Sequence, residues 1–405
     1  MSPAFRYLLQ EVRRSSQLSF VLAKQTDLSS RSHCFSTAAK EAEKVDETKI
    51  VKSVFISQSN DIFTNLALED WLYRNFNFKQ HHVMMLWQND PCVVIGRHQN
   101  PWQEANMGSL AEQNILLARR NSGGGAVFHD SGNLNMTFFT PRECYSRKAN
   151  LKIISSALKR AFSIETKINE REDIVFDDNL KISGTASKLG RPNAYHHCTL
   201  LVNVNTSQLS DSLHKYEKGI QSNATESKPA PVLNLQNVCN EINVKNLIET
   251  VGYEYLRTLS LSGQDAGQDL ISKQRGFQLI NPTEEWFPGL DKIRAEFESW
   301  TWRFGRTPKF QVSRSFEVPY DLTKSNEKEE LSISLVVEGG FIEDVILKIP
   351  PSLVAVDGFL KNAEMLTSLR GHMFTEDALD KLHVALVNQG QPFVADCVRH
   401  TMSSV

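Results

Sequence analysis

The chain has 405 residues, of which 40% are hydrophobic and 23% charged, and its formal net charge is −2. This length predicts two or three domains, and this composition is ordinary for a globular protein. The charge argues against a nucleic-acid-binding protein, and no apolar run approaches the roughly 20 residues that cross a bilayer. Six scattered cysteines without a Cys-x-x-Cys pair indicate neither a zinc site nor a disulfide framework. We therefore expect no nucleic-acid partner, no membrane insertion and no tightly bound metal.

Residues 1–35 differ from the rest of the chain. They carry five basic side chains and seven serines against two acidic side chains. A basic, serine-rich and acid-poor leader is typical of an organellar transit peptide, whereas a secretory signal needs an uninterrupted apolar core. We predict that residues 1–35 are a mitochondrial transit peptide and that the mature protein acts in the matrix. A disordered basic tail is the alternative.

Short apolar runs and amphipathic stretches alternate irregularly after residue 53. Their periodicity predicts strands over 54–56, 83–87, 92–96 and 134–139 and helices over 65–72, 110–114 and 151–162. Because strands and helices interleave without a regular βαβ repeat, the pattern favours an α+β fold with a mixed sheet. A polar, proline-bearing stretch over 222–235 predicts a mobile loop.

A cluster of turn signals, Asn281-Pro282 and Pro288-Gly289, separates a second unit from the first. Periodicity in this unit predicts a helix over 293–300, strands over 310–318, 331–338 and 341–349, and helices over 359–370 and 375–388. The predicted organisation is a large domain over residues 50–280 and a small α+β accessory domain over residues 290–405.

The most informative stretch is residues 119–130, Arg-Arg-Asn-Ser-Gly-Gly-Gly-Ala-Val-Phe-His-Asp. Glycines without Cβ atoms allow close approach of a ligand and positive φ angles, and two arginines offer charge for a phosphate or carboxylate. The glycine spacing matches neither the Rossmann nor the P-loop pattern, and the alternative to a binding loop is a flexible turn without a binding role. With the apolar strand that follows, the stretch predicts a pocket for an extended, partly anionic ligand.

Two further motifs follow. Residues 177–188 place Lys181 beside serine, glycine and threonine, and residues 194–204 contain His196-His197 and end as a buried strand. Adjacent residues on a strand point to opposite faces, so this histidine pair is a poor metal site.

In their order, these motifs resemble the lipoate–protein ligase and lipoyltransferase family. The family pattern stands here as Arg-Arg-x-Ser-Gly-Gly-Gly-Ala-Val-Phe-His-Asp-x-Gly-Asn, then Lys-Ile-Ser-Gly-Thr-Ala, then His-His-x-Thr-Leu-Leu. Residues 300–310 also match, and the similarity begins near residue 56. The resemblance is strongest to the mitochondrial lipoyltransferases of animals. It implies a catalytic domain of the biotin and lipoate ligase type, followed by an accessory domain.

The resemblance also implies an activity. The chain would be a lipoyl amidotransferase that moves a lipoyl group from lipoyl-AMP, or from the lipoylated glycine-cleavage H protein, to protein lysines. The acceptors would be acyltransferase subunits of the pyruvate, 2-oxoglutarate and branched-chain 2-oxoacid dehydrogenases, and lipoyl-AMP would be the bound acyl donor. The alternatives are a complete ATP-dependent lipoate–protein ligase and a non-catalytic protein that binds lipoyl-adenylate or carrier proteins.

Lys181 is the predicted catalytic residue. In the resembled family this lysine contacts the acyl carbonyl and the adenylate phosphate, and a fixed cation there stabilises developing negative charge. A solvated surface lysine is the alternative. The residues predicted to bind lipoyl-AMP are Arg120, Ser122, Gly123, Gly124, Gly125, Val127, Phe128, His129, Asn133, Arg171, Lys181, His197, Thr199 and Thr225.

The resemblance divides these residues between two parts of the ligand. Arg120, Val127, His129 and Asn133 would contact the nucleotide, with Phe128 packed beside them, whereas His197 and Thr199 would face the lipoyl group. His129 could equally be a satisfied loop histidine. Arg171 could be an ordinary surface ion pair with little energetic weight.

Two positions depart from the bacterial ligases of the family. Cys198 replaces a glycine, and Ala224 replaces an arginine of the adenylate-binding loop. Loss of that guanidinium should weaken binding of a triphosphate more than binding of an adenylate, so we expect poor ATP-dependent activation of free lipoate. Cys198 is also a conceivable nucleophile for a thioester route.

Lipoyl-carrier domains are small and usually acidic, so a basic rim on this chain would steer them toward the site. A scattered solvated surface is the alternative. The predicted rim residues are Arg97, His98, Arg119, Lys188 and Arg191.

Overall fold

The structure is a computed structural model that describes residues 46–177, 179–214, 219–323, 328–354, 369–375 and 392–403, with a few isolated positions between 376 and 391. The predicted transit peptide lies outside the described residues, as do most of the predicted helices over 359–370 and 375–388. Within the described ranges, no helix is long and apolar enough to cross a membrane.

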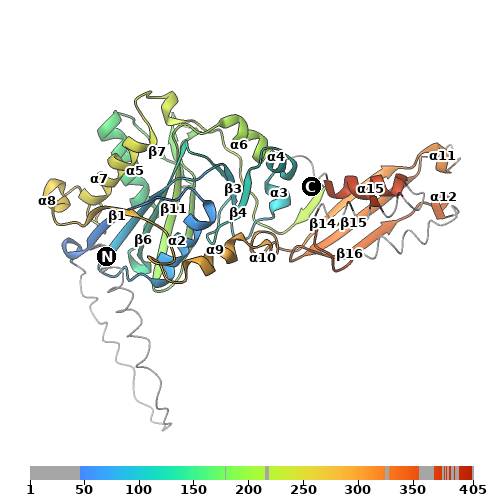
Figure 1. Cartoon of the computed structure of the whole chain (residues 1–405). Helices are drawn as coiled ribbons and strands as arrows, with labels where there is room; N and C mark the ends of the chain where they lie inside the picture. The colour runs from blue at the N-terminus through green and yellow to red at the C-terminus, as the bar shows by residue number, and fades with distance from the viewer. Residues whose placement is uncertain are drawn as a thin grey trace, which may run out of the picture.

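A six-stranded mixed sheet forms the centre of the larger body (Figure 1). Its strands are, in spatial order, β10 (Thr185–Leu189), β11 (Asn193–Leu201), β6 (Asn133–Pro141), β2 (His81–Trp87), β1 (Val51–Ser57) and β13 (Gly276–Ile280). Strand β1 pairs in parallel with β2 and β13, and the remaining pairs are antiparallel. The predicted α+β class with a mixed sheet is confirmed.

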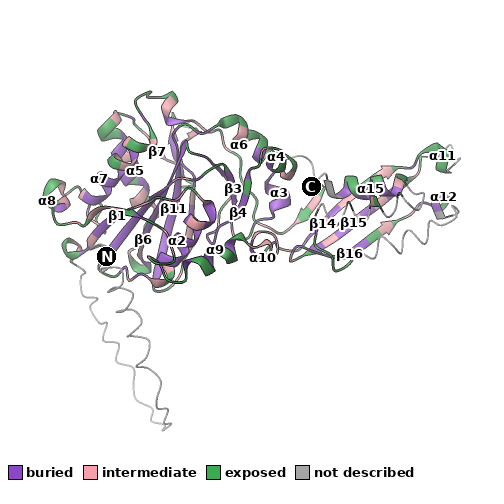
Figure 2. Cartoon of the chain, in the orientation of Figure 1, coloured by how far each residue is buried: buried purple, intermediate pink, exposed green. Residues whose placement is uncertain are grey.

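Helices cover both faces of this sheet. Helices α2 (Ile62–Asn75) and α9 (Leu290–Glu298) pack on one face, and α5 (Arg147–Phe162) and α7 (Val244–Arg257) pack on the other. The central strands β2, β6 and β11 are almost wholly buried, whereas the edge strands β10 and β13 are partly exposed (Figure 2). Because side chains alternate along a strand, β11 sends Tyr195 to the α2 core and Cys198 to the α5 core.

Two smaller three-stranded sheets flank the large one. The first contains β4 (Leu116–Arg119), β3 (Cys92–Ile95) and β5 (Val127–His129), and the second contains β7 (Lys167–Ile168), β8 (Ile174–Phe176) and β9 (Leu180–Lys181). The short helices of this body are α3 (Pro101–Glu104), α4 (Met107–Glu112), α6 (Thr206–Leu213) and α8 (Gly267–Ile271), with 3₁₀ turns at Glu47–Lys49, Arg142–Cys144 and Leu235–Asn237.

A second body is built on a four-stranded antiparallel sheet, with the strands β12 (Ile220–Ser222), β14 (Phe310–Glu317), β15 (Glu330–Glu338) and β16 (Phe341–Lys348) (Figure 1). Its described helices are α11 (Tyr320–Thr323), α12 (Pro351–Val354) and α15 (Pro392–Ser403). Strand β12 comes from the range that we assigned to the catalytic domain. The segment after β12 therefore runs from this second sheet back into the larger body.

The predicted strands over 54–56, 83–87, 92–96 and 134–139 and the three strands of the second unit are all present. One predicted helix is split: α9 ends at Glu298, and α10 (Trp300–Arg303) begins after Ser299. Ser299 has extended backbone angles, and its hydroxyl accepts a hydrogen bond from the Trp302 amide at 3.2 Å, so it caps the second helix.

Two buried histidines at the start of β2 should make the fold sensitive to acid. Burial lowers the pKa of His81 and of His82 from 6.5 to about 3. Below pH 6.5 the two histidines bind protons in the unfolded chain but stay neutral in the native protein. Their contribution to the free energy of unfolding is therefore fully present above pH 6.5 and is lost as the pH falls toward 3. Lowering the pH from 7.5 to 5.5 should therefore reduce the free energy of unfolding by about 3 kcal/mol, about half from each histidine. Urea unfolding at pH 7.5 and 5.5 measures the loss; His82→Gln should about halve it, and His98→Gln at an exposed position should leave it unchanged.

Candidate functional site

Two adjoining cavities lie beside the glycine loop, residues 122–125. The tryptophan cavity, about 290 Å³, reaches Trp87, and the phenylalanine cavity, about 400 Å³, is lined by Phe128. Strand β5 lies between them, because His129 lines the first alone while Phe128 lines the second alone. The residues that line both cavities are Ala126, Val127, Lys181, Gly184, Thr199, Ser227 and Lys228.

Most of the predicted ligand-binding residues meet at these cavities. Those that line at least one are Arg120, Gly124, Gly125, Val127, Phe128, His129, Asn133, Arg171, Lys181, His197, Thr199 and Thr225. Ser122 and Gly123 line neither. The Ser122 carbonyl instead accepts a hydrogen bond from the Arg97 amide at 2.9 Å, so this half of the loop is turned toward the protein.

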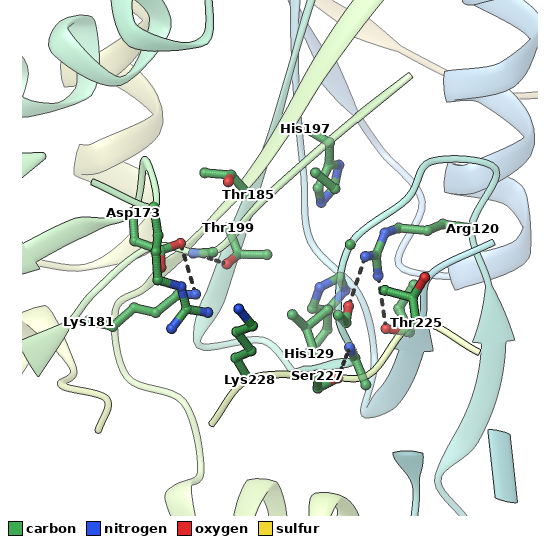
Figure 3. Close-up of a pocket in the computed structure, with 18 of the residues that line it drawn as sticks. Arg120, His129, Asp173, Lys181, Thr185, His197, Thr199, Thr225, Ser227 and Lys228 are labelled. Carbon is green, nitrogen blue, oxygen red and sulfur yellow. Dashed lines mark hydrogen bonds and ion pairs between the residues drawn. The ribbon is translucent and has the colours of Figure 1, made fainter. Parts of the chain in front are cut away.

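Lys181 lies at the junction of the two cavities. Its Nζ is 2.9 Å from Oδ1 of Asp173, and its side chain is 20% exposed. Its backbone is held on both sides, since its amide donates to the Pro231 carbonyl at 2.9 Å and its carbonyl accepts from the Leu233 amide at 3.0 Å. Figure 3 shows Lys181 and Asp173 together at one wall of the pocket. The amine is thus aimed and still reachable from solvent.

Gly184 allows Lys181 and Thr199 to approach one another. Its amide donates to Oγ1 of Thr199 at 3.0 Å, and the Thr199 amide donates back to the Gly184 carbonyl at 2.9 Å. A Cβ at position 184 would lie 3.3 Å from that hydroxyl oxygen and 3.9 Å from Nζ of Lys181. A larger residue there would narrow the junction.

Arg120 shapes the glycine loop from behind. Its guanidinium donates to the carbonyls of Gly123 at 2.7 Å, Gly125 at 2.8 Å and Val94 at 3.1 Å. Burial lowers its pKa to about 10, so the group stays charged at neutral pH. Gly124 has a φ of 94°, in the region that favours glycine. These contacts turn the loop amides into a fixed edge of the tryptophan cavity.

The segment after β12 crosses the site as a strap over residues 223–228. The hydroxyl of Ser227 accepts from the Ala126 amide at 2.7 Å and from Nε2 of Gln99 at 3.0 Å, which ties the strap to the glycine loop. Lys228 then extends into the pocket between Lys181 and His129 (Figure 3). The strap thus adds a second lysine, which sequence analysis missed although it directly follows the predicted adenylate-binding loop.

Two histidines and Trp87 form the far end of the tryptophan cavity. The indole ring is 5.3 Å from the ring of His197 and 6.3 Å from that of His129, in edge-to-face arrangements. Glu69 of α2 accepts hydrogen bonds from Thr137 at 2.7 Å and from Nδ1 of His197 at 3.1 Å. Burial raises the pKa of Glu69, but the bonds from His197 and Thr137 outweigh it and hold the pKa below its usual value.

The two adjacent histidines of β11 point to opposite faces, as predicted. His196 stacks on Phe138, with 6.0 Å between the rings, in the α5 core, whereas His197 lines the tryptophan cavity. Within the described ranges, no group of three histidine, cysteine, aspartate or glutamate side chains could hold a metal ion.

The family model described as the lipoyl protein ligase A/B catalytic domain matches residues 61–255. The mitochondrial lipoyl amidotransferase LIPT1 of Mus musculus is 43% identical over 296 residues, covering 73% of this chain and 75% of that protein. The protein of the same name from Homo sapiens is 41% identical over 306 residues, covering 75% and 78%. The chain belongs to the lipoyl amidotransferase and lipoate–protein ligase family. It is therefore an enzyme, an acyltransferase acting on protein lysine.

More distant similarities point to the same family and fold. Lipoate-protein ligase A of Psychrobacter cryohalolentis is 37% identical over 249 residues, covering 61% of this chain and 70% of that protein. The solved structure of P. falciparum LipL1 in complex with lipoate covers 85% of this chain and 99% of its own, at 24% identity and a TM-score of 0.54. Such a likeness supports the family fold, with a large catalytic domain and an additional C-terminal region.

Two expectations about this lipoyltransferase site are wrong. Cys198 is fully buried in the α5 core, on the strand face away from the cavities, and burial raises the pKa of its thiol far above the usual value. It therefore cannot act as a nucleophile there. Arg119 is not part of a basic rim, because it is 0% exposed and donates to Gln99, Arg303 and Thr307.

The rest of the predicted rim is divided. Lys188 pairs with the buried carboxylate of Asp70 at 3.1 Å, so its charge is already partnered. The guanidinium of Arg97 hydrogen-bonds Asn121 and lies 5.8 Å from the Trp302 ring. Only His98 and Arg191 of the predicted rim are exposed.

Proposed function

We propose that the chain is a lipoyl amidotransferase that takes a lipoyl group from lipoyl-AMP, or from the lipoylated glycine-cleavage H protein. The acceptors are lysines on the acyltransferase subunits of the pyruvate, 2-oxoglutarate and branched-chain 2-oxoacid dehydrogenases, in the mitochondrial matrix. The relatives in mouse and man are named as mitochondrial lipoyl amidotransferases, which supports lipoyl transfer and a mitochondrial location.

One observation carries this proposal: the cations lie where the two cavities join. Lys181 and Lys228 line both cavities, beside the amides of the glycine loop. Lipoyl-AMP has an apolar tail, a mixed anhydride of carboxyl and phosphate in its middle, and a nucleoside at the other end. A site with two arms and a cationic centre matches this order.

The chemistry of the two walls suggests which arm takes which end. The tryptophan cavity has Leu66, Trp87 and Val94 for the acyl chain. The phenylalanine cavity has Phe128 for a flat ring and Asn133 as a polar partner. We therefore assign His129 to the lipoyl arm, although resemblance placed it at the nucleotide.

Lys181 acts electrostatically in this mechanism. The acceptor lysine amine attacks the lipoyl carbonyl, and the cation of Lys181 stabilises the oxyanion of the tetrahedral intermediate. Collapse breaks the bond between carbonyl carbon and phosphate oxygen, forms the amide and releases AMP, while the amine proton passes to solvent. Lys228 neutralises the phosphate of the leaving group.

The donor distinguishes this proposal from a complete ligase. Ala224 offers no guanidinium on the strap. The single charge of Lys228 can neutralise the one phosphate of an adenylate but not the three phosphates of ATP. Mature protein should therefore lipoylate an acceptor domain from lipoyl-AMP at a rate at least about tenfold above that from free lipoate with ATP. Mass spectrometry of the acceptor measures both. Equal rates would establish the ligase, and no transfer from lipoyl-AMP would favour a non-catalytic binding protein.

A further inference from the structure

His129 has one ring nitrogen engaged and one without a partner. Its Nδ1 lies 2.9 Å from Nδ2 of Asn89, and its Nε2 is buried with no hydrogen-bond partner among the described residues. The side chain is 1% exposed and lines the tryptophan cavity. A buried polar nitrogen without a partner is uncommon in native proteins and points to a ligand.

A chain of amides fixes which nitrogen carries the proton. Nδ2 of Asn65 donates to the Ser59 carbonyl at 2.8 Å, the Gln88 carbonyl at 3.0 Å and Oδ1 of Asn89 at 3.0 Å. The two carbonyls can only accept, so the NH₂ group must face them and the amide cannot be turned round; its Oδ1 accepts from Oγ of Ser57 at 2.7 Å.

Asn89 is oriented in turn. Its oxygen faces the donor of Asn65, so its NH₂ group faces Nδ1 of His129, which must accept. Burial holds the pKa of His129 well below its usual value, so the ring is neutral. The single ring proton is therefore on Nε2, and the cavity wall presents an N–H donor.

We propose that this fixed donor makes His129 a specificity-determining residue, which selects lipoyl over octanoyl groups by pairing with a dithiolane sulfur. The proposal rests on the function proposed above. Strand β11 rises about 7 Å from Thr199, at the cationic junction, to His197, at the far end. This is about the reach of the methylene chain between the lipoyl carbonyl and its ring.

The two acyl groups meet the donor differently. An octanoyl chain ends in a methyl group, which leaves the buried N–H without an acceptor, and burying an unpaired donor is costly. A dithiolane sulfur is a weak acceptor and also packs well against an aromatic ring such as Trp87. A weak acceptor recovers part of the cost, so we expect about a tenfold preference for lipoyl.

A competition experiment tests this. The mature protein, without the predicted transit peptide, is given equal amounts of lipoyl-AMP and octanoyl-AMP and a limiting amount of acceptor domain. Mass spectrometry then gives the ratio of lipoylated to octanoylated acceptor. We expect about ten to one for the wild type. A ratio near one would overturn the proposal and leave the transferase function intact, whereas transfer of neither group would count against the proposed function itself.

Two variants locate the cause. Asn89→Asp keeps an acceptor for Asn65 but cannot donate to Nδ1, so the proton moves to Nδ1 and the ratio should fall toward one. His129→Phe keeps a ring without a donor and should do the same if the aspartate variant misfolds. An unchanged ratio in a folded variant would refute the assignment.

The chain offers a matched control on the other face of the sheet. Nδ2 of Asn150 lies 3.3 Å from Nδ1 of His196, the same type of contact, but His196 does not line either cavity. Asn150→Asp should leave the ratio at its wild-type value. Nitrogen-15 NMR of the His129 ring gives an independent readout, with the proton on Nε2 in the wild type and on Nδ1 in Asn89→Asp.

Discussion

Lys181→Ala is expected to slow lipoyl transfer from lipoyl-AMP by about 10²- to 10³-fold, the usual effect of removing one preorganised donor to an oxyanion. The ammonium lies at the junction of the two cavities, 2.9 Å from Asp173, so it is positioned before the substrate arrives. Single-turnover kinetics with preformed lipoyl-AMP would separate this loss from any change in binding.

The variant should still fold. Apart from the ion pair with Asp173, the contacts that hold position 181 come from its backbone, which bonds to Pro231 and Leu233 and survives truncation of the side chain. Lys181→Arg should recover little activity, because a planar fork does not replace a compact point charge. Lys152→Ala, on the exposed side of α5, is the matched control and should transfer normally. A wild-type transfer rate in Lys181→Ala would show that the Lys181 cation does not stabilise the oxyanion.

The parts of the site that sequence could predict lie within short motifs. Lys181 and Gly184 are three residues apart, and Thr199 meets them through the pairing of β10 with β11. The glycine loop likewise depends on its own arginine, since Arg120 bonds to Gly123 and Gly125. Local chemistry of this kind leaves a pattern that a single sequence displays.

The residues that were missed depend on distant partners. Glu69 is on helix α2, and a carboxylate on a helix normally faces water, yet it is buried against Thr137 and His197. Lys228 follows a strand of the second sheet, and its place in the pocket depends on that pairing and on the bonds of Ser227 to the larger body. No periodicity within either segment indicates such a position.

The two adjacent arginines illustrate the same limit. As neighbours on a chain they appeared equivalent, and both were expected to offer charge to a ligand. The structure directs Arg120 to the glycine loop and Arg119 to a segment that begins 184 residues later in sequence. The burial of Arg119 could not be inferred, because most of its acceptors are backbone carbonyls, which any sequence possesses, and its one side-chain acceptor, Thr307, is distant in sequence.

Arg119→Met is expected to lower the free energy of unfolding by about 3–5 kcal/mol, because it breaks a buried hydrogen-bond network. The guanidinium donates to the Gln99 carbonyl at 2.7 Å, the Arg303 carbonyl at 2.9 Å and Oγ1 of Thr307 at 2.9 Å. Methionine fills a similar volume but leaves these buried oxygens without a donor. Arg119→Lys should also be destabilised, since one ammonium cannot reach Gln99, Arg303 and Thr307 at once.

The matched control is Arg306→Met, which removes the same charge from the same neighbourhood. Arg306 is exposed and lies 5.2 Å from the Trp302 ring, so its loss should cost about 0.5–1 kcal/mol. Guanidinium unfolding followed by tryptophan fluorescence measures both variants. Equal stabilities would show that the Arg119 network contributes nothing beyond its charge.

The same variant should also impair catalysis, because Arg119 connects the segment that leads from α10 into β14 with the site. Its guanidinium donates to the Gly96 carbonyl at 3.4 Å, and a Cβ at Gly96 would lie only 2.1 Å from the Gly124 oxygen, so these two backbones pack directly. Releasing Gly96 loosens the glycine loop. We therefore expect a higher KM for lipoyl-AMP in Arg119→Met at temperatures where the protein stays folded, and a wild-type KM would separate the stability role from the site.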